Sequence, residues 1–295
     1  MRLLVTGAGG LVGGRLALKL AEGREFTVVA GRHRAPTPPG LVEQLVDLGS
    51  TASIEAMIEA SRPDAVVHCA AAADADRCEA DPAAAEATNV QAPELLARAC
   101  ARRDVALVAL STDLVFPGDR AFSTVADDAR SALVYGRTKR AGEQAVLASH
   151  PRAAVARIAL VSGRGHGPRG TATEAIAWAL RAGQPLRLFT DQYRTPVDPD
   201  SVADGVARIL RQGGSGIYHL GGPERLSRHE LGQRVARRLG LPADRIEACR
   251  RGDLSGAPRP ADVSLDSSRA KRELGWTART VDEAIAAGRP EAAPL

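Results

Sequence analysis

Residues 5–20 read VTGAGGLVGGRLALKL, a glycine-rich loop between a short apolar run and a helical pattern. The run before it, residues 2–6, has the length and composition of a buried strand. Gly7 suits a tight turn, Gly10 a close approach of a ligand to the backbone, and Gly13 close packing of a helix on a sheet. The N–H groups that open the following helix would face a pyrophosphate. The stretch therefore predicts a strand–loop–helix unit that binds a dinucleotide.

The first 160 residues alternate such apolar runs with longer helical patterns. The runs RLLVT, FTVVAG, DAVVHCA and VALVALS are separated by segments with helical periodicity, which is the arrangement of repeated βαβ units. We therefore expect an α/β fold with a Rossmann-type, doubly wound parallel sheet over residues 1–160. After residue 160 the rhythm is less regular, with a helix expected at 171–181. Residues 161–295 are predicted to form a smaller substrate-binding region with segments returning to the first domain.

Composition excludes several classes of protein. The chain has 295 residues, 44% of them hydrophobic, and a net charge of +4. Only 3% are aromatic, so the many arginines have no stacking partners and a nucleic-acid-binding role is not expected. No apolar run approaches the roughly 20 residues of a membrane span and the N-terminus does not resemble a signal peptide, so we expect no membrane association and a cytoplasmic location. The four cysteines lack CxxC spacing, and no metal site is predicted.

The end of the second expected strand reads VVAGRHRAP, residues 28–36. A unit that binds NAD normally has Asp or Glu here for the ribose hydroxyls, whereas this chain has Arg32 and Arg34 and no carboxylate in the stretch. A guanidinium can clamp a 2′-phosphate, so NADP(H) is favoured over NAD(H), which stays possible because these arginines could also be solvated loop residues.

Two further segments carry reactive side chains. One strand ends in Ser111, Thr112 and Asp113, at the edge where ligands of parallel sheets bind, although such hydroxyls can also satisfy backbone groups. Tyr135 and Lys139 are four residues apart, which places them on one face of a helix. A nearby ammonium stabilises phenolate, so the sequence predicts a lowered pKa for Tyr135 and a role as acid catalyst.

Together the segments TGAGGLVG, STDLVF and VYGRTKRAGE resemble the extended short-chain dehydrogenase/reductases. Within that family the chain is most similar to dTDP-4-dehydrorhamnose reductases, which carry STDYVF, YGxSKxxGE and a segment like AAAADADRCE, residues 70–79. The segment RPADVSLDSSRAKRELGW, residues 259–276, resembles the end of UDP-glucose 4-epimerases. The resemblance implies an NADP(H)-dependent reductase that transfers hydride to a keto group of a nucleotide-linked deoxysugar. A sugar-nucleotide 4-epimerase or dehydratase, or a non-catalytic NADP-binding regulatory subunit, are the alternatives.

The resemblance also implies the site. Thr112, with Ser111 as the alternative, Tyr135 and Lys139 would be catalytic, and Thr112, Asp113, Tyr135 and Arg259 would bind substrate, with Arg259 on its pyrophosphate. The expected cofactor-binding residues are Gly7, Gly10, Leu11, Val12, Gly13, Arg32, Arg34, Asp47, Leu48, Ala70, Ala71, Tyr135 and Lys139.

Departures from the family pattern leave the substrate open. Leu160 stands where these reductases have a tryptophan, and Leu114 where they have a tyrosine. Both changes alter the expected sugar pocket, so the identity of the ketone stays open. The oligomeric state also stays open, with a homodimer as the candidate.

Overall fold

The computed structural model describes residues 1–253 and 259–288, so the end of the predicted 161–295 region lies outside the described residues. Its centre is a seven-stranded sheet in which every neighbouring pair is parallel, in the order β3-β2-β1-β4-β5-β6-β9. This confirms the predicted α/β, Rossmann-type, doubly wound fold. The strands are β1 (Arg2–Thr6), β2 (Thr27–Arg32), β3 (Val42–Leu45), β4 (Ala65–His68), β5 (Ala106–Thr112), β6 (Ala154–Ile158) and β9 (Gly216–Leu220).

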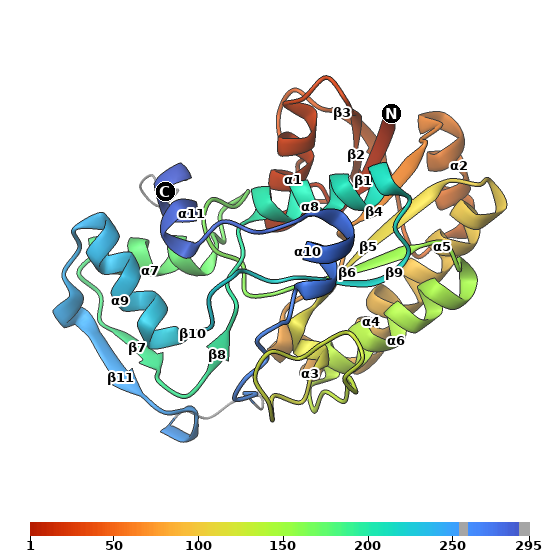
Figure 1. Cartoon of the computed structure of the whole chain (residues 1–295). Coiled ribbons are helices and arrows are strands. Elements are labelled where there is room, and N and C mark those ends of the chain that lie inside the picture. Colours follow the sequence, from red (N-terminus) through yellow and green to blue (C-terminus); the bar gives the residue numbers. More distant parts are fainter. Residues whose placement is uncertain (254–258, 289–295) are drawn as a thin grey trace.

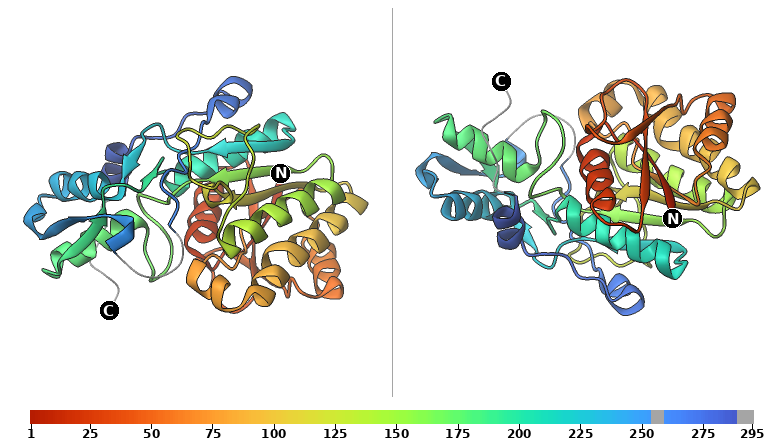
Figure 2. Two further views of the ribbon diagram at one scale, coloured as in Figure 1. Left: turned by 90° about the horizontal axis from the view of Figure 1, so that it is seen from below. Right: turned by 90° about the horizontal axis from the view of Figure 1, so that it is seen from above.

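Helices cover both faces of the sheet, as Figures 1 and 2 show. Successive side chains of a strand point to opposite faces, so Leu3 and Val5 of β1 join one apolar cluster while Leu4 joins the other. The first cluster lies under α1 (Leu11–Ala21), α8 (Pro199–Gln212) and α10 (Ser268–Leu274), and the second under α2 (Thr51–Ser61), α5 (Ala92–Arg102) and α6 (Val134–Ser149). Shorter elements on this half are α3 (Ala75–Ala80), α4 (Pro82–Glu86), the π-helical η1 (Ala87–Gln91) and the 3-10 turn η2 (Asp113–Val115).

A smaller region lies beside the sheet, at the left of Figure 1. It has its own apolar cluster, which includes Ile176, Leu231 and Ile285. The predicted helix at 171–181 is present as α7, with Thr171 as its N-cap. The elements are α7 (Ala172–Arg181), α9 (Arg228–Leu239), α11 (Val281–Ala287), the parallel pair β7 (Leu186–Phe189) and β11 (Ile246–Cys249), the antiparallel pair β8 (Tyr193–Arg194) and β10 (Leu226–Ser227), and the 3-10 turns η3 (Ala243–Arg245) and η4 (Arg251–Asp253).

Parts of the chain after residue 160 return to the sheet. Strand β9 pairs with β6 and forms one edge of the seven-stranded sheet. Helix α8 packs against the first half as well, since Arg15 of α1 donates to Asp200 of α8 at 2.7 Å. The segment after Arg259 runs beside the loop after β5, with a bridge between Asp119 and Asp262. A division into two domains at residue 160 stays a prediction.

Two kinds of feature are absent from residues 1–253 and 259–288. None of the helices there is both long enough and apolar enough to cross a bilayer. Those same residues contain no cluster of three or more His, Cys, Asp or Glu side chains that could hold a metal ion.

Candidate active site

The glycine-rich loop links β1 to α1 at the point where the strand order reverses, which is where such sheets bind ligands. Gly7 has a φ of +72°, and the N–H of Gly10 donates to its carbonyl at 2.9 Å. A Cβ on Gly7 would lie 2.5 Å from the nitrogen of Ala70, and one on Gly13 would lie 2.3 Å from the carbonyl oxygen of Gly7. The chain can therefore pass this closely only with glycine at both positions.

The other expected contacts of the loop lie near it. Leu11 and Val12 form the first turn of α1, so their N–H groups belong to the positive end of that helix. Ala70 and Ala71 follow β4, whose end adjoins the loop. This arrangement has the form of a dinucleotide cradle.

The end of β2 differs from the expectation in one respect. Strand β3 runs parallel to β2 and brings Glu43 within reach of Arg32, whose Nε lies 3.3 Å from the Glu43 carboxylate. Glu43 also accepts a hydrogen bond from Thr37, and that contact holds the pKa of its carboxyl below the usual range. The stretch itself has no carboxylate, as the sequence shows, but the neighbouring strand β3 brings the acid Glu43 to the end of β2. Arg34 is exposed.

Asp47 and Leu48 follow β3. Asp47 is exposed, and its Oδ1 accepts a hydrogen bond from the N–H of Gly49 at 3.0 Å. Leu48 packs partly buried against the second apolar cluster. Both residues lie in the turn that precedes α2.

Thr112, at the end of β5, and Tyr135 and Lys139, on α6, are all buried. The Thr112 hydroxyl donates to Oδ1 of Asp113 at 3.1 Å and accepts from the N–H of Leu114 at 3.2 Å. It also lies close enough to the Tyr135 phenol to affect its pKa. Lys139 Nζ donates to the carbonyl of Leu110 at 2.8 Å. The structure thus brings the three expected catalytic residues to one end of the sheet.

Burial has the largest effect on the pKa values of Tyr135 and Lys139. It raises the pKa of Tyr135 to about 12, although the neighbouring Thr112 hydroxyl acts in the opposite direction. Burial also lowers the pKa of Lys139 to about 8, opposed by the charge of Glu143. The expected lowering of the Tyr135 pKa is therefore wrong for this structure, since removal from water outweighs nearby charge. Tyr135 is a neutral phenol with a proton to donate.

Ser111 points elsewhere. Its hydroxyl donates to Glu143 at 2.5 Å, and Glu143 forms a fully buried, bidentate pair with Arg157 at 2.9 and 2.8 Å. Of the two hydroxyls left open by the sequence, Thr112 is the one beside Tyr135.

Asp113 forms a buried ion pair that the sequence did not indicate. Arg194 of β8 donates to both of its carboxylate oxygens at 2.6 Å. Burial raises the pKa of Asp113, and the charge of Arg194 opposes that rise. The pair joins the smaller region to the sheet next to Thr112, and nothing in the local sequence around Arg194 predicts it.

Asn89 is a second residue that sequence reasoning missed. It lies in the π-helical turn η1 and is 1% exposed. Its side chain accepts from the N–H of Ala72 at 2.9 Å and donates to Ala72 O and Thr138 Oγ1, each at 3.1 Å. It therefore fixes the loop after β4 to the helix that carries Tyr135 and Lys139.

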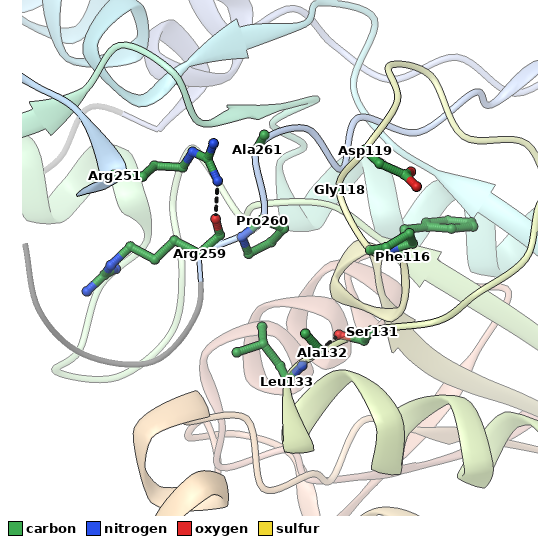
Figure 3. A pocket seen from close by; sticks show the side chains of 11 residues that line it. Phe116, Gly118, Asp119, Ser131, Ala132, Leu133, Arg251, Arg259, Pro260 and Ala261 are labelled. Atoms are coloured by element: carbon green, nitrogen blue, oxygen red, sulfur yellow. Dashed lines mark hydrogen bonds between the residues drawn. The ribbon is translucent and has the colours of Figure 1, made fainter.

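Arg259 lines a pocket of about 220 Å³, shown in Figure 3. Arg251 donates to the carbonyl of Arg259 at 2.5 Å, while the Arg259 guanidinium lies exposed, 5.2 Å from the ring of Phe189. Leu133, two residues before Tyr135, lies on another wall of the pocket. Thr112, Asp113 and Tyr135 do not line it, so the expected substrate residues are not gathered in one pocket.

Curated relatives align over nearly the whole chain. A probable low-salt glycan biosynthesis reductase, Agl14, of Haloferax volcanii is 32% identical, covering 97% of both chains. The dTDP-4-dehydrorhamnose reductase of Mycobacterium tuberculosis is 32% identical over 92% of this chain and 86% of its own. Methionine adenosyltransferase 2 subunit beta of Mus musculus is 30% identical over 95% and 84%.

Solved structures give the same picture. A dTDP-4-dehydrorhamnose reductase of Clostridium acetobutylicum superposes with a TM-score of 0.85 at 23% identity, covering 97% of both chains. That of Bacillus anthracis, solved with NADP, gives 0.84 at 20% identity, covering 96% and 95%. These two show the fold alone. MoeE5 in complex with UDP-glucose and NAD gives 0.82 at 26% identity, covering 97% and 96%.

The model of the RmlD substrate binding domain matches residues 1–289, nearly the full length of the chain. The match, the relatives and the geometry at the end of the sheet agree with the resemblance found in the sequence. The chain belongs to the RmlD substrate-binding family of extended short-chain dehydrogenase/reductases.

Proposed function

We propose that the protein is an NADP(H)-dependent reductase that transfers hydride to a keto group of a nucleotide-linked deoxysugar. The observation that carries the proposal is the pair of adjacent hydroxyls of Thr112 and Tyr135, buried at the carboxyl end of the sheet with Lys139 one helical turn further on. The family relationship to named reductases supports the same reaction.

A bound nicotinamide cofactor would supply the hydride, and the loop from Gly7 to Gly13 fits its pyrophosphate because Cβ atoms there would clash with the backbone. Tyr135 donates its phenolic proton to the carbonyl oxygen as that oxygen gains charge. The Thr112 hydroxyl, which donates to Oδ1 of Asp113 at 3.1 Å in this structure, turns its hydrogen toward the same oxygen, and Lys139 stabilises the phenolate that is left. Solvent returns the proton to Tyr135 after the reaction.

The choice of cofactor rests on the end of β2. Arg34 is exposed and available to a 2′-phosphate, whereas Arg32 is shared with Glu43. We therefore propose NADP(H) as the preferred cofactor. NAD(H) stays possible, because Glu43 can accept hydrogen bonds from a ribose as an acid does in NAD-binding units.

Arg259 is proposed to bind the pyrophosphate of the substrate, and Asp113 to contact the sugar. The support for Arg259 is that it lines the pocket of Figure 3 and that it is exposed. Asp113 is 0% exposed and paired with Arg194, so a sugar reaches it only if that pair opens.

The test is NADPH oxidation against a panel of 4-keto sugar nucleotides, with the corresponding free ketones as controls. We expect turnover with at least one nucleotide-linked ketone and none without the nucleotide. A 4-epimerase would interconvert sugar nucleotides with no net NADPH consumption. A regulatory subunit, the role suggested by the similarity to methionine adenosyltransferase 2 subunit beta, would bind NADPH and turn over nothing.

A cytoplasmic location and a homodimer are further proposals that rest on the sequence and the family resemblance. Sedimentation at several protein concentrations would test the dimer.

A further inference from the structure

A small cavity, lined in part by Lys139, lies between α6 and the ends of β4 and β5. Its volume is about 10 Å³, close to the space that one water molecule needs. Polar side chains of His68, Asn89, Ser111, Lys139 and Glu143 line it. A polar lining of this kind favours an ordered water over an empty void.

Most of the polar groups that line the cavity already have hydrogen-bond partners. Glu143 receives four hydrogen bonds, from Ser111, Arg140 and twice from Arg157, so its lone pairs are taken. Both amide hydrogens of Asn89 are used by Ala72 and by Thr138. Lys139 has three N–H groups and gives one of them to Leu110.

His68 has the clearest unmet need. It is 2% exposed, and its Nδ1 lies 2.8 Å from the hydroxyl of Thr6 on β1. Within residues 1–253 and 259–288, its Nε2 is buried with no hydrogen-bond partner. An unpaired buried nitrogen costs free energy, so this atom at the wall of a polar cavity points to a bound molecule.

We propose that the cavity holds one internal water that accepts a hydrogen bond from Lys139 and donates one to Nε2 of His68. His68 is thereby a positioning residue for Lys139, and this role rests on the proposed catalytic use of that lysine. The positive ammonium selects the tautomer in which Nε2 presents its lone pair and Nδ1 carries the proton toward Thr6. Lys139 is then held by Leu110 and the water, and its third N–H is left for the active site.

The arrangement has a consequence for the charge of Lys139. The titratable groups that face this lysine are Glu143, Cys69 and His68. Burial, followed by the charge of Lys139, lowers the pKa of His68 to about 3, so the imidazole stays neutral and can accept. A water that bridges Lys139 to this neutral imidazole stabilises the ammonium, and it therefore raises the pKa of Lys139.

Two substitutions of His68 distinguish the proposed water bridge to Lys139 from a role of His68 in packing alone. In His68→Asn the shorter amide can keep the contact to Thr6 but does not reach the cavity, whereas the longer amide of His68→Gln reaches it. Activity that needs the ammonium is lost as pH rises through the pKa of Lys139. We expect the alkaline limb of the kcat profile to move to lower pH by about half a unit or more in His68→Asn and to return in His68→Gln, with KM for NADPH unchanged.

His150→Gln is the matched control, because His150 is a buried histidine that bonds to the carbonyl of Val105 and does not line the cavity. His150→Gln should leave the alkaline limb of the kcat profile at its wild-type pH. Superposable profiles for wild type and His68→Asn would overturn the proposal.

A second measurement needs neither turnover nor a variant that folds. A high-resolution crystal structure of the wild-type protein should show one water within hydrogen-bonding distance of Lys139 Nζ and His68 Nε2. A cavity without that water, or with Nε2 bonded to a protein group, would overturn the proposal. Absence of ketone reduction with the water present would instead count against the proposed function.

Discussion

The two ends of the candidate active site are built differently. At the end of the sheet, Thr112, Tyr135 and Lys139 are at most 8% exposed and are held by backbone and side-chain contacts. At the outer end, Arg259 is exposed on a loop and its guanidinium lies 5.2 Å from the ring of Phe189. The atoms of the proposed chemistry are therefore fixed by the core, while those that would select the substrate are carried by a loop.

We expect the largest effect from a substitution of Tyr135, in the buried part of the site at the end of the sheet. Tyr135→Phe removes the transferable proton and keeps the ring, so kcat should fall by about 10² to 10⁴ with NADPH affinity nearly unchanged. Steady-state kinetics and calorimetric titration of NADPH measure the two quantities. Tyr218→Phe is the matched control, because the Tyr218 hydroxyl donates to Glu273, remote from Thr112, and its loss should leave kcat as it is. Wild-type turnover in Tyr135→Phe would show that Tyr135 is not the acid catalyst.

The buried pair beneath the site should dominate stability. Glu143→Ala leaves Arg157 as an unpaired charge with 1% of its side chain exposed, and it should lower the free energy of unfolding by about 3 to 5 kcal/mol. Glu94→Ala, which breaks the exposed pair with Arg98, should cost less than about 1 kcal/mol. Urea denaturation of both variants gives the comparison. Equal losses would show that the two pairs do not differ as their burial implies.

A smaller effect is expected at the outer end. Arg259→Ala removes a phosphate contact made equally in ground and transition states, so KM for the nucleotide sugar should rise about 10- to 150-fold with little change in kcat. NADPH affinity should not change, since the glycine loop is elsewhere. Arg120→Ala, an exposed arginine paired with Asp127, is the control. An unchanged KM would remove Arg259 from the substrate site.

The smallest effect concerns the cofactor. Arg34→Ala should weaken NADPH binding by about tenfold and leave NADH binding unchanged, because only the contact to the 2′-phosphate is lost. Glu43→Gln should act in the opposite sense by freeing Arg32. Equal affinities for the two cofactors in the wild-type protein would contradict the proposed preference.

The sequence predicted the sheet, the glycine loop and the three central residues because each is a local pattern. Gly7 follows β1 directly, Gly13 lies in the first turn of α1, and Tyr135 and Lys139 are one helical turn apart. Contacts between distant segments leave no such pattern. Glu43 reaches Arg32 only through the pairing of β3 with β2, and β3 itself is largely exposed and has little apolar signal.

The Tyr135 pKa was mispredicted for a related reason. Spacing along a helix shows that an ammonium is near, but it does not show how deeply the phenol is buried. The pair of Asp113 with Arg194 likewise depends on how the smaller region sits against the sheet, which no local motif encodes.

The most direct test of the central claim uses NADPH carrying deuterium at the transferred position of the nicotinamide. With a nucleotide-linked 4-keto deoxysugar as substrate, we expect one deuterium per molecule in the alcohol product, bound to the carbon that bore the ketone, and one NADP⁺ formed for each product. The Tyr135→Phe protein should form this product at least about a hundredfold more slowly. Product without the label, or interconversion of sugar nucleotides with no NADP⁺ formed, would contradict the account.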